Sequence, residues 1–118
     1  MADPSPAEPL SPLSMAILLA LADGPRHGYA LMNDIEAQTE GALAPGTGSL
    51  YAGLQRLMGD GLIREAEGEE GADRRRRYFA ITEEGREAAR AEMNRMLRVL
   101  RVAEKKELAG DLRPAETG

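Results

Sequence analysis

Four segments of this chain have the hydrophobic pattern of helices. The first is expected over residues 12–22, with Ser11 as its N-cap and Asp23-Gly24-Pro25 as the break that ends it. This segment is apolar nearly all round, which is typical of a helix that is buried on both sides. Because the core of a small domain is not expected to cover both faces, part of this helix is predicted to contact another subunit.

The second and third helices are predicted to be amphipathic. The second covers residues 27–39, and the third begins near Gly48 with an apolar stripe of Leu50, Leu54, Leu57 and Met58. The loop over residues 41–48 is short enough to set these two helices at an angle, as in helix-turn-helix motifs. Gly61 is placed where a left-handed residue ends a helix.

A β-hairpin is predicted after the third helix. Its first strand begins at Leu62-Ile63, and the aromatic and β-branched content of residues 76–81 predicts the returning strand. Residues 67–73 between them are acids, glycines and an alanine, so they are expected to form the tip. Thr82 is the predicted N-cap of the following helix.

The last helix, over residues 83–108, has a narrow apolar seam. Its small and apolar residues at three- and four-residue steps are Ala89, Met93, Met96, Leu100 and Ala103, flanked by Leu97 and Val99. A long helix with such a seam and charged remaining faces requires a partner, so we predict a dimer arm. The predicted dimer contacts from both apolar helices are Met15, Leu18, Leu19, Met93, Met96, Leu97, Leu100 and Ala103.

The elements together predict a mainly α-helical fold with a small β-hairpin. Residues 11–82 would form a winged helix-turn-helix domain, and residues 83–108 one long C-terminal dimerisation helix. Residues 1–10, rich in proline, alanine and acids, are expected to be a disordered tail, and residues 109–118 a flexible one.

Composition narrows the functional classes. A chain of 118 residues is long enough for one domain, and the absence of cysteine agrees with a reducing cytosol. The longest apolar run, residues 15–22, is too short to span a membrane, and no signal peptide is visible, so a cytoplasmic protein without a membrane partner is expected. A single histidine and no cysteine argue against a metal site, and no cofactor is expected.

The net charge of −5 is the main objection to nucleic-acid binding, since a DNA-binding protein is expected to present a basic surface. The distribution of charge reduces the objection. Residues 74–77 form an unbroken run of arginines, whereas the acids gather in residues 65–73 and at the termini. A well-placed local contact is expected to outweigh mild overall repulsion.

Ten residues are candidates for DNA contact. They are His27, Tyr29, Ser49, Tyr51, Gln55, Arg56, Arg74, Arg75, Arg76 and Arg77.

Each group of candidates also has a structural interpretation. The arginines would contact phosphate or the minor groove, or would pair with the acidic tip across the hairpin. Gln55 and Arg56 suit adenine and guanine edges, but also an ordinary surface helix. Ser49 is expected as a helix cap or phosphate donor, Tyr51 as a half-buried ring with its hydroxyl toward phosphate, and His27 as the partner of a local hydrogen bond or a phosphate.

These segments resemble the PadR family of bacterial transcriptional regulators over about residues 11–105. The resemblance is carried by His27-Gly28-Tyr29-Ala30-Leu31, Gly48-Ser49-Leu50-Tyr51, Leu57 with Gly61-Leu62-Ile63, and Arg77-Tyr78-Phe79 before Ile81-Thr82-Glu83-Glu84-Gly85.

The resemblance implies a homodimer built from the first and last helices and repression by binding an operator near a promoter. The single C-terminal helix is similar to the shorter branch of the family. Some multidrug-binding relatives stack drugs on aromatic residues of the last helix. This helix has no aromatic residue and the chain has no tryptophan, so such stacking is not expected.

Three functional classes follow. The favoured one is a dimeric repressor that places two third helices in successive major grooves and that a small effector between the subunits would release. The second is a winged-helix module for protein interaction without specific DNA binding, which the net charge of −5 supports. An enzyme is not expected, because no nucleophile with a base and no metal ligand set can be assembled, so there are no catalytic residues.

Overall fold

The computed structural model describes residues 9–68 and 76–108. Its elements in chain order are α1 (Pro12–Leu21), β1 (Arg26–His27), α2 (Gly28–Gln38), α3 (Thr47–Gly59), β2 (Ile63–Ala66), β3 (Tyr78–Ile81) and α4 (Glu83–Lys105). Residues 1–8 of the tail expected over residues 1–10, the tail expected over residues 109–118, residues 69–73 of the predicted tip, and Arg74 and Arg75 lie outside the described residues. The expected tail is too long at its end, because Leu10 packs against the core and its N–H donates to Glu92.

The sheet has three antiparallel strands in the order β1-β3-β2, so the prediction of a hairpin alone was incomplete. Ile63 pairs with Ile81 across the hairpin, and β1 joins its other edge by pairing His27 with Tyr78. A strand of two residues has no hydrophobic period to detect, which is why β1 was missed. The returning strand also begins at Tyr78 rather than at residue 76.

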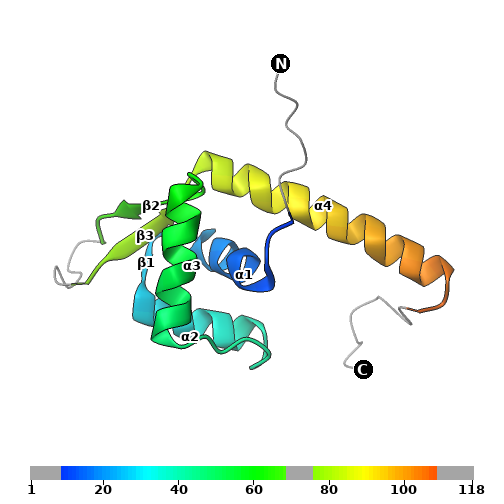
Figure 1. Cartoon of the computed structure of the whole chain (residues 1–118), viewed down its shortest axis with the longest axis horizontal. Coiled ribbons are helices and arrows are strands. Elements are labelled where there is room, and N and C mark those ends of the chain that lie inside the picture. Colours follow the sequence, from blue (N-terminus) through cyan, green and yellow to red (C-terminus); the bar gives the residue numbers. More distant parts are fainter. Residues whose placement is uncertain (1–8, 69–75, 109–118) are drawn as a thin grey trace, which may run out of the picture.

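Helix α1 is the centre of the core. It contacts α2, α3, α4 and β3, and Figure 1 shows it enclosed between these elements. Leu18 has no exposed area and Met15 is 8% exposed, whereas Leu19 is 43% exposed. One chain therefore covers nearly all of α1, contrary to expectation, because elements pack on several sides of it. Leu18 belongs to this core and is removed from the predicted dimer contacts.

Predicted signals at the helix ends are largely confirmed. The side chains of Ser11 and Thr82 accept hydrogen bonds from the backbone N–H groups of Ser14 and Gly85, both at 3.0 Å. Gly61 has a φ of +77°, the left-handed geometry expected after α3.

The expected cap at Ser49 is wrong. Helix α3 begins two residues earlier, at Thr47, and Gly46 occupies the N-cap position without a side-chain hydrogen bond. Ser49 therefore lies in the first turn of α3 rather than before it.

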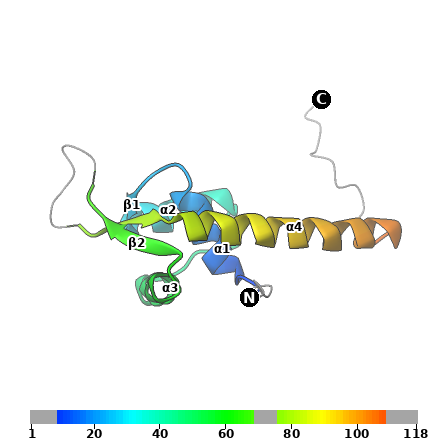
Figure 2. The same cartoon turned by 90° about the horizontal axis from the view of Figure 1, so that it is seen from above.

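Helix α4 begins on the sheet and extends far beyond the rest of the chain (Figures 1 and 2). Its first turns are anchored, because Gly85, Ala89 and Glu92 are buried. From Met93 onward its large apolar side chains are exposed. Within the described ranges, no helix is both long and apolar enough to cross a bilayer.

Glu92 ties the start of the chain to α4. Its Oε1 accepts hydrogen bonds from the Leu10 N–H at 3.1 Å and from Nη2 of Arg95 at 2.9 Å. The hydrogen bond from Arg95, followed by the one from Leu10, holds the pKa of Glu92 below its usual value of 4.5.

This lowered pKa predicts acid sensitivity. Because the folded state favours ionised Glu92, its stabilising effect is present above pH 4.5 and is lost as the pH falls through the folded-state pKa. We expect Glu92→Gln to be less stable than the natural chain at neutral pH, with the difference shrinking as the pH falls below 4.5. Urea unfolding at several pH values measures this. A difference that is constant with pH would contradict the assignment.

Candidate nucleic-acid interface

Five of the ten predicted DNA contacts line one pocket. The basic pocket has a volume of about 430 Å³ and is formed by His27, Gly28, Tyr29, Tyr51, Arg76 and Arg77. These residues come from β1, the start of α2, α3 and the segment before β3. The pairing of β1 with β3 explains the convergence, since it places His27 beside Tyr78 at the base of the wing.

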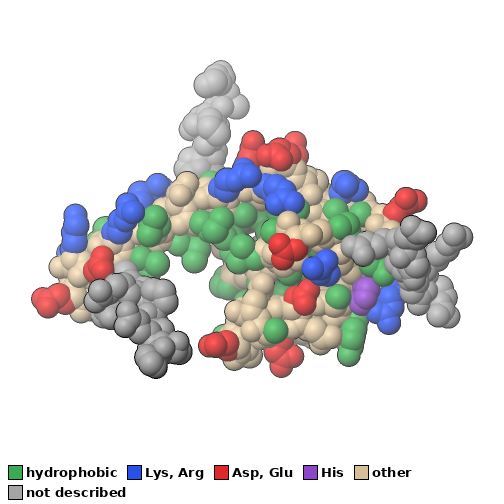
Figure 3. Space-filling view, turned by 180° about the vertical axis from the view of Figure 1, so that it is seen from behind, with side chains coloured by type: hydrophobic (Ala, Val, Ile, Leu, Met, Phe, Trp, Pro, Cys, Tyr) green, Lys and Arg blue, Asp and Glu red, His purple; other side chains and the backbone are tan. Residues whose placement is uncertain are grey.

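His27 connects helix α2 to the wing. Its Nδ1 accepts a hydrogen bond from the Ala30 N–H at 3.2 Å, which confirms the expected local bond and caps α2. Nη1 of Arg76 lies 3.0 Å from Nε2 of the ring, and Tyr78 meets the ring edge to face at 5.4 Å. In Figure 3 the histidine, the only one in the chain, is at the surface with basic side chains beside it.

Tyr51 connects α3 to the start of α2. Its ring is half-buried, as expected, and meets Phe79 edge to face at 6.2 Å. Its hydroxyl lies against Gly28, where an added Cβ would overlap the hydroxyl and approach the ring Cζ to 2.9 Å. Glycine at position 28 therefore allows the two helices of the motif to approach closely. Tyr29, next to it, is 63% exposed.

Arg77 has a structural partner in the wing. Its Nε donates to Oε2 of Glu65 at 3.0 Å, and its guanidinium carbon lies 5.2 Å from the centre of the Phe79 ring. The hydrogen bond from Arg77 lowers the pKa of Glu65. The alternative in which arginine pairs with acid across the hairpin thus holds for Arg77, although 47% of its side chain remains exposed. For Arg74 and Arg75, both contact with DNA and pairing with an acid remain predictions.

Among the described residues, no other helix or strand covers the outer face of α3. Ser49, Ala52, Gln55 and Arg56 are all exposed there, while Leu50, Leu54 and Leu57 face the core. Glutamine and arginine on an exposed helix face have the donors and acceptors that pair with base edges.

Two surface residues, Arg26 and Val102, were not among the candidates selected from the sequence. Arg26 directly precedes the capping histidine and adds a cation at the edge of the sheet. Its Nε lies 3.4 Å from Oδ2 of Asp34. Val102 on α4 is 52% exposed. Arg26 was recognisable as a basic neighbour of His27, but only the pairing of β1 places it beside the wing.

In the part of the chain that the structure describes, no cluster of His, Asp or Glu is arranged to hold a metal ion.

The predicted dimer face is mostly exposed in one chain. Leu19, Met93, Met96, Leu97 and Leu100 each have between 42% and 47% of their surface accessible. Figure 3 shows hydrophobic side chains along one side of α4 and basic ones along its outer edge. Ala103 is half-buried.

Comparison with known proteins agrees with this fold. Residues 17–91 match the model of the transcriptional regulator PadR-like family. A transcriptional regulator from Clostridium thermocellum superimposes with a TM-score of 0.66 at 27% identity, over 79% of this chain and 87% of that one. A PadR family transcription regulator from Clostridium difficile shares the fold, with a TM-score of 0.68 at 19% identity, over 80% of this chain and 97% of that one.

One curated relative is more similar in sequence. It is an uncharacterised 37.1 kDa protein in a transposon of Streptomyces fradiae, 45% identical over 85 residues, which are 72% of this chain. The match spans only 23% of that longer relative. The family match covers more than half of the chain and includes α2, α3, the wing and the start of α4. The chain therefore belongs to the PadR-like family of transcriptional regulators.

Proposed function

We propose that this protein is a homodimeric, sequence-specific DNA-binding repressor of the bacterial cytoplasm. The observation that carries the proposal is the basic pocket, which lies next to the exposed face of α3. A winged helix places its third helix in the major groove and its wing on the adjacent backbone. The pocket would then receive phosphate, and α3 would read base edges.

Individual residues have distinct roles in this proposal. Gln55 and Arg56 project from α3 and would contact bases, since an amide pairs with adenine and a guanidinium with guanine. Arg76 and the hydroxyl of Tyr51 line the pocket and would hold phosphate. Arg77 would hold the shape of the wing through Glu65 and contribute its remaining exposed surface.

The dimer would form through α4. The large apolar side chains of α4 from Met93 onward are exposed, and an exposed apolar face of this kind is typical of an interface. The end of this helix extends past the body of one chain (Figure 1). Residues 11–82 would then be the DNA-binding domain and residues 83–108 the dimerisation helix. Two copies of α3 would meet successive major grooves about 10 base pairs apart. A small effector held between the subunits would change this spacing and release the DNA.

A mobility-shift titration on the DNA upstream of the protein's own gene tests the proposal. We expect a specific complex whose affinity falls as salt is added, because phosphate contacts release counterions. An unrelated DNA of equal length is the control. Failure to form a specific complex even at low salt would contradict the repressor function.

Arg76→Ala tests the role of the basic pocket. We expect weaker binding to specific and non-specific DNA alike, and a slope of log K against log salt that is smaller by about 1, because one phosphate contact is lost. Arg98→Ala is the matched control, since Arg98 is exposed on α4 and makes no ion pair within the described residues. Equal slopes for the natural chain and Arg76→Ala would show that Arg76 does not contact phosphate.

The second candidate is a winged-helix module that binds protein rather than DNA. The net charge of −5 and the pairing of Arg77 with Glu65 favour it. The same titration separates the two candidates, because this module would show no difference between the upstream DNA and the unrelated control.

A further inference from the structure

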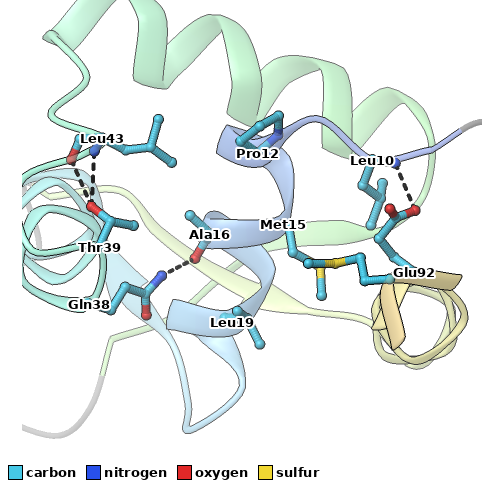
Figure 4. A pocket seen from close by; sticks show the side chains of 10 residues that line it. Leu10, Pro12, Met15, Ala16, Leu19, Gln38, Thr39, Leu43 and Glu92 are labelled. Atoms are coloured by element: carbon cyan, nitrogen blue, oxygen red, sulfur yellow. Dashed lines mark hydrogen bonds between the residues drawn. The ribbon is translucent and has the colours of Figure 1, made fainter. Parts of the chain in front are cut away.

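Side-chain hydrogen bonds fasten the first half of α4 to the rest of the chain at several points. At the start of the helix, Oγ1 of its N-cap Thr82 donates to the Gly61 carbonyl oxygen at 2.7 Å. Near the middle, Oε1 of Glu92 accepts from the Leu10 N–H at 3.1 Å, and Figure 4 shows this bond as a dashed line. The helix is therefore held at its start by the turn after α3 and further along by the segment before α1.

Arg86 makes a bond between these two points, and it connects α4 to the end of α1. Its Nη2 donates to the Ala22 carbonyl oxygen at 3.1 Å. Ala22 is the C-cap of α1, and the last carbonyl groups of a helix lack partners within it and carry partial negative charge. A guanidinium group from α4 thus caps α1, and a charged donor makes this bond stronger than a neutral one.

The apolar contacts of α4 would not fix its direction by themselves. Helix α4 packs on α1 and β3, and among its described residues the small Ala89 is the one that belongs to the buried apolar core. Helices packed through apolar contacts slide past one another in shear motions. A hydrogen bond is directional and weakens as its angle changes, so the bond of Arg86 opposes a tilt of α4 against α1.

The length of α4 converts a small tilt at Arg86 into a large displacement. Leu100, on the proposed dimer face, lies about 21 Å further along the helix, at about 1.5 Å per residue. A tilt of about 10° at Arg86 would move Leu100, and the partner that it contacts, by about 4 Å relative to α3. Adjacent base pairs are about 3.4 Å apart, so this tilt corresponds to about one base pair of half-site spacing.

We propose that Arg86 is a positioning residue for DNA recognition, which fixes the direction of α4 and thereby the half-site spacing that the dimer accepts. The inference rests on the proposed function, because it requires a dimer that reads two half-sites. Arg86 does not line the basic pocket and is not on α3, so it would select among operators without contacting bases. The selection would come from rejecting operators of the wrong spacing.

The first test measures the distance between the two copies of α3 without DNA. The chain has no cysteine, so Ala52→Cys on the exposed face of α3 gives one site for a spin label in each subunit. We expect one narrow distribution of distances between subunits in the otherwise natural chain. Adding Arg86→Met, which keeps an unbranched side chain but removes the donor, should widen the distribution at least about twofold, because α4 can then tilt.

Matched variants show whether the bond to α1 is the cause. Arg90→Met removes the same group one turn further along α4, where Arg90 is exposed and lies 4.0 Å from Glu83, and should leave the distribution narrow. Arg86→Lys keeps a charged donor and should restore most of the narrow distribution. Arg86→Gln, which is shorter and uncharged, should widen it, so the result does not depend on the folding of one variant.

Two results of this measurement would count against the inference. A distribution as narrow in Arg86→Met and Arg86→Gln as in the natural chain would overturn the role of Arg86. If the otherwise natural chain gives no distance between subunits, the proposed dimer fails and this inference fails with it.

The second test measures the spacing preference on DNA. One duplex carries the upstream segment located by footprinting, and the other has one base pair inserted between its half-sites. The insertion adds about 3.4 Å and turns one half-site by about 35°, so we expect it to weaken binding by the natural chain at least about tenfold. Arg86→Met should reduce this ratio of affinities at least about threefold, because its arms adapt to either spacing.

The ratio separates positioning from stability. Both affinities are measured on the same protein, so a smaller folded fraction lowers them equally and leaves their ratio unchanged. An equal ratio for the natural chain and Arg86→Met would contradict the inference. If the natural chain is a dimer and forms no specific complex, the proposed DNA-binding function fails, whereas the distance measurement still decides whether Arg86 holds α4 in place.

Discussion

Gly85→Ala is expected to lower the free energy of unfolding by about 3 kcal/mol, the upper range for forcing an extra methyl group into a packed site. A Cβ at this position would overlap the carbonyl oxygen of Leu62 and lie 2.8 Å from Cγ1 of Ile81. The oxygen belongs to the backbone and accepts a hydrogen bond from the Thr82 N–H at 3.0 Å, so it cannot rotate away. Urea unfolding followed by circular dichroism measures the loss.

Gly59→Ala is the matched control for this prediction. Gly59 is the last residue of α3, and a Cβ added there would meet nothing within 4 Å. Alanine in a helix without a clash is expected to stabilise the chain by about 0.5–1 kcal/mol. If the two variants unfold at the same urea concentration, the close packing of α4 on the hairpin is not as the structure describes.

Leu100→Asp is expected to convert the protein into monomers and to weaken binding to a two-half-site operator by at least about 100-fold. The first effect follows because Leu100 is 42% exposed on the apolar face of α4, where a partner would bury the new charge. The second follows because two linked DNA-binding units gain about 10²–10⁴ in affinity over one. Light scattering measures the mass, and mobility shift measures the affinity.

Asn94→Asp introduces the same side chain elsewhere on α4. The two positions are six residues apart along the helix, so Asn94 lies about 120° around it from Leu100, outside the apolar face. This control should remain dimeric. A dimer that persists with Leu100→Asp would place the interface on another surface, and the proposal for α4 would have to be withdrawn.

Hydrophobic spacing and local capping chemistry predicted four helices and a hairpin with little error. Ser11, Gly61 and Thr82 mark helix ends through bonds and backbone angles that involve only neighbouring residues or the next element. Local signals of this kind are readable in a sequence because they do not depend on the rest of the fold. The strand β1 was not readable, because two residues acquire a strand conformation only by pairing with β3.

The candidate site also has one part that the sequence predicted and another that depends on the fold. Residue types and their order were sufficient to select His27, Tyr29, Tyr51, Arg76 and Arg77. Their convergence on one pocket depends on β1 and on the absence of a side chain at position 28. The pairing of Arg77 with Glu65 depends on the register of the hairpin, which the sequence left open.

The sequence by itself determined the class of fold and the family, because helix periods, caps and the order of short motifs are local properties of the chain. Only the tertiary structure decided how the apolar surface is divided between the core and a partner. Leu18 and Leu19 are chemically identical neighbours, yet Leu18 is fully buried and Leu19 is 43% exposed. The difference arises because α2, α3, α4 and β3 pack around α1 and leave one strip of it uncovered.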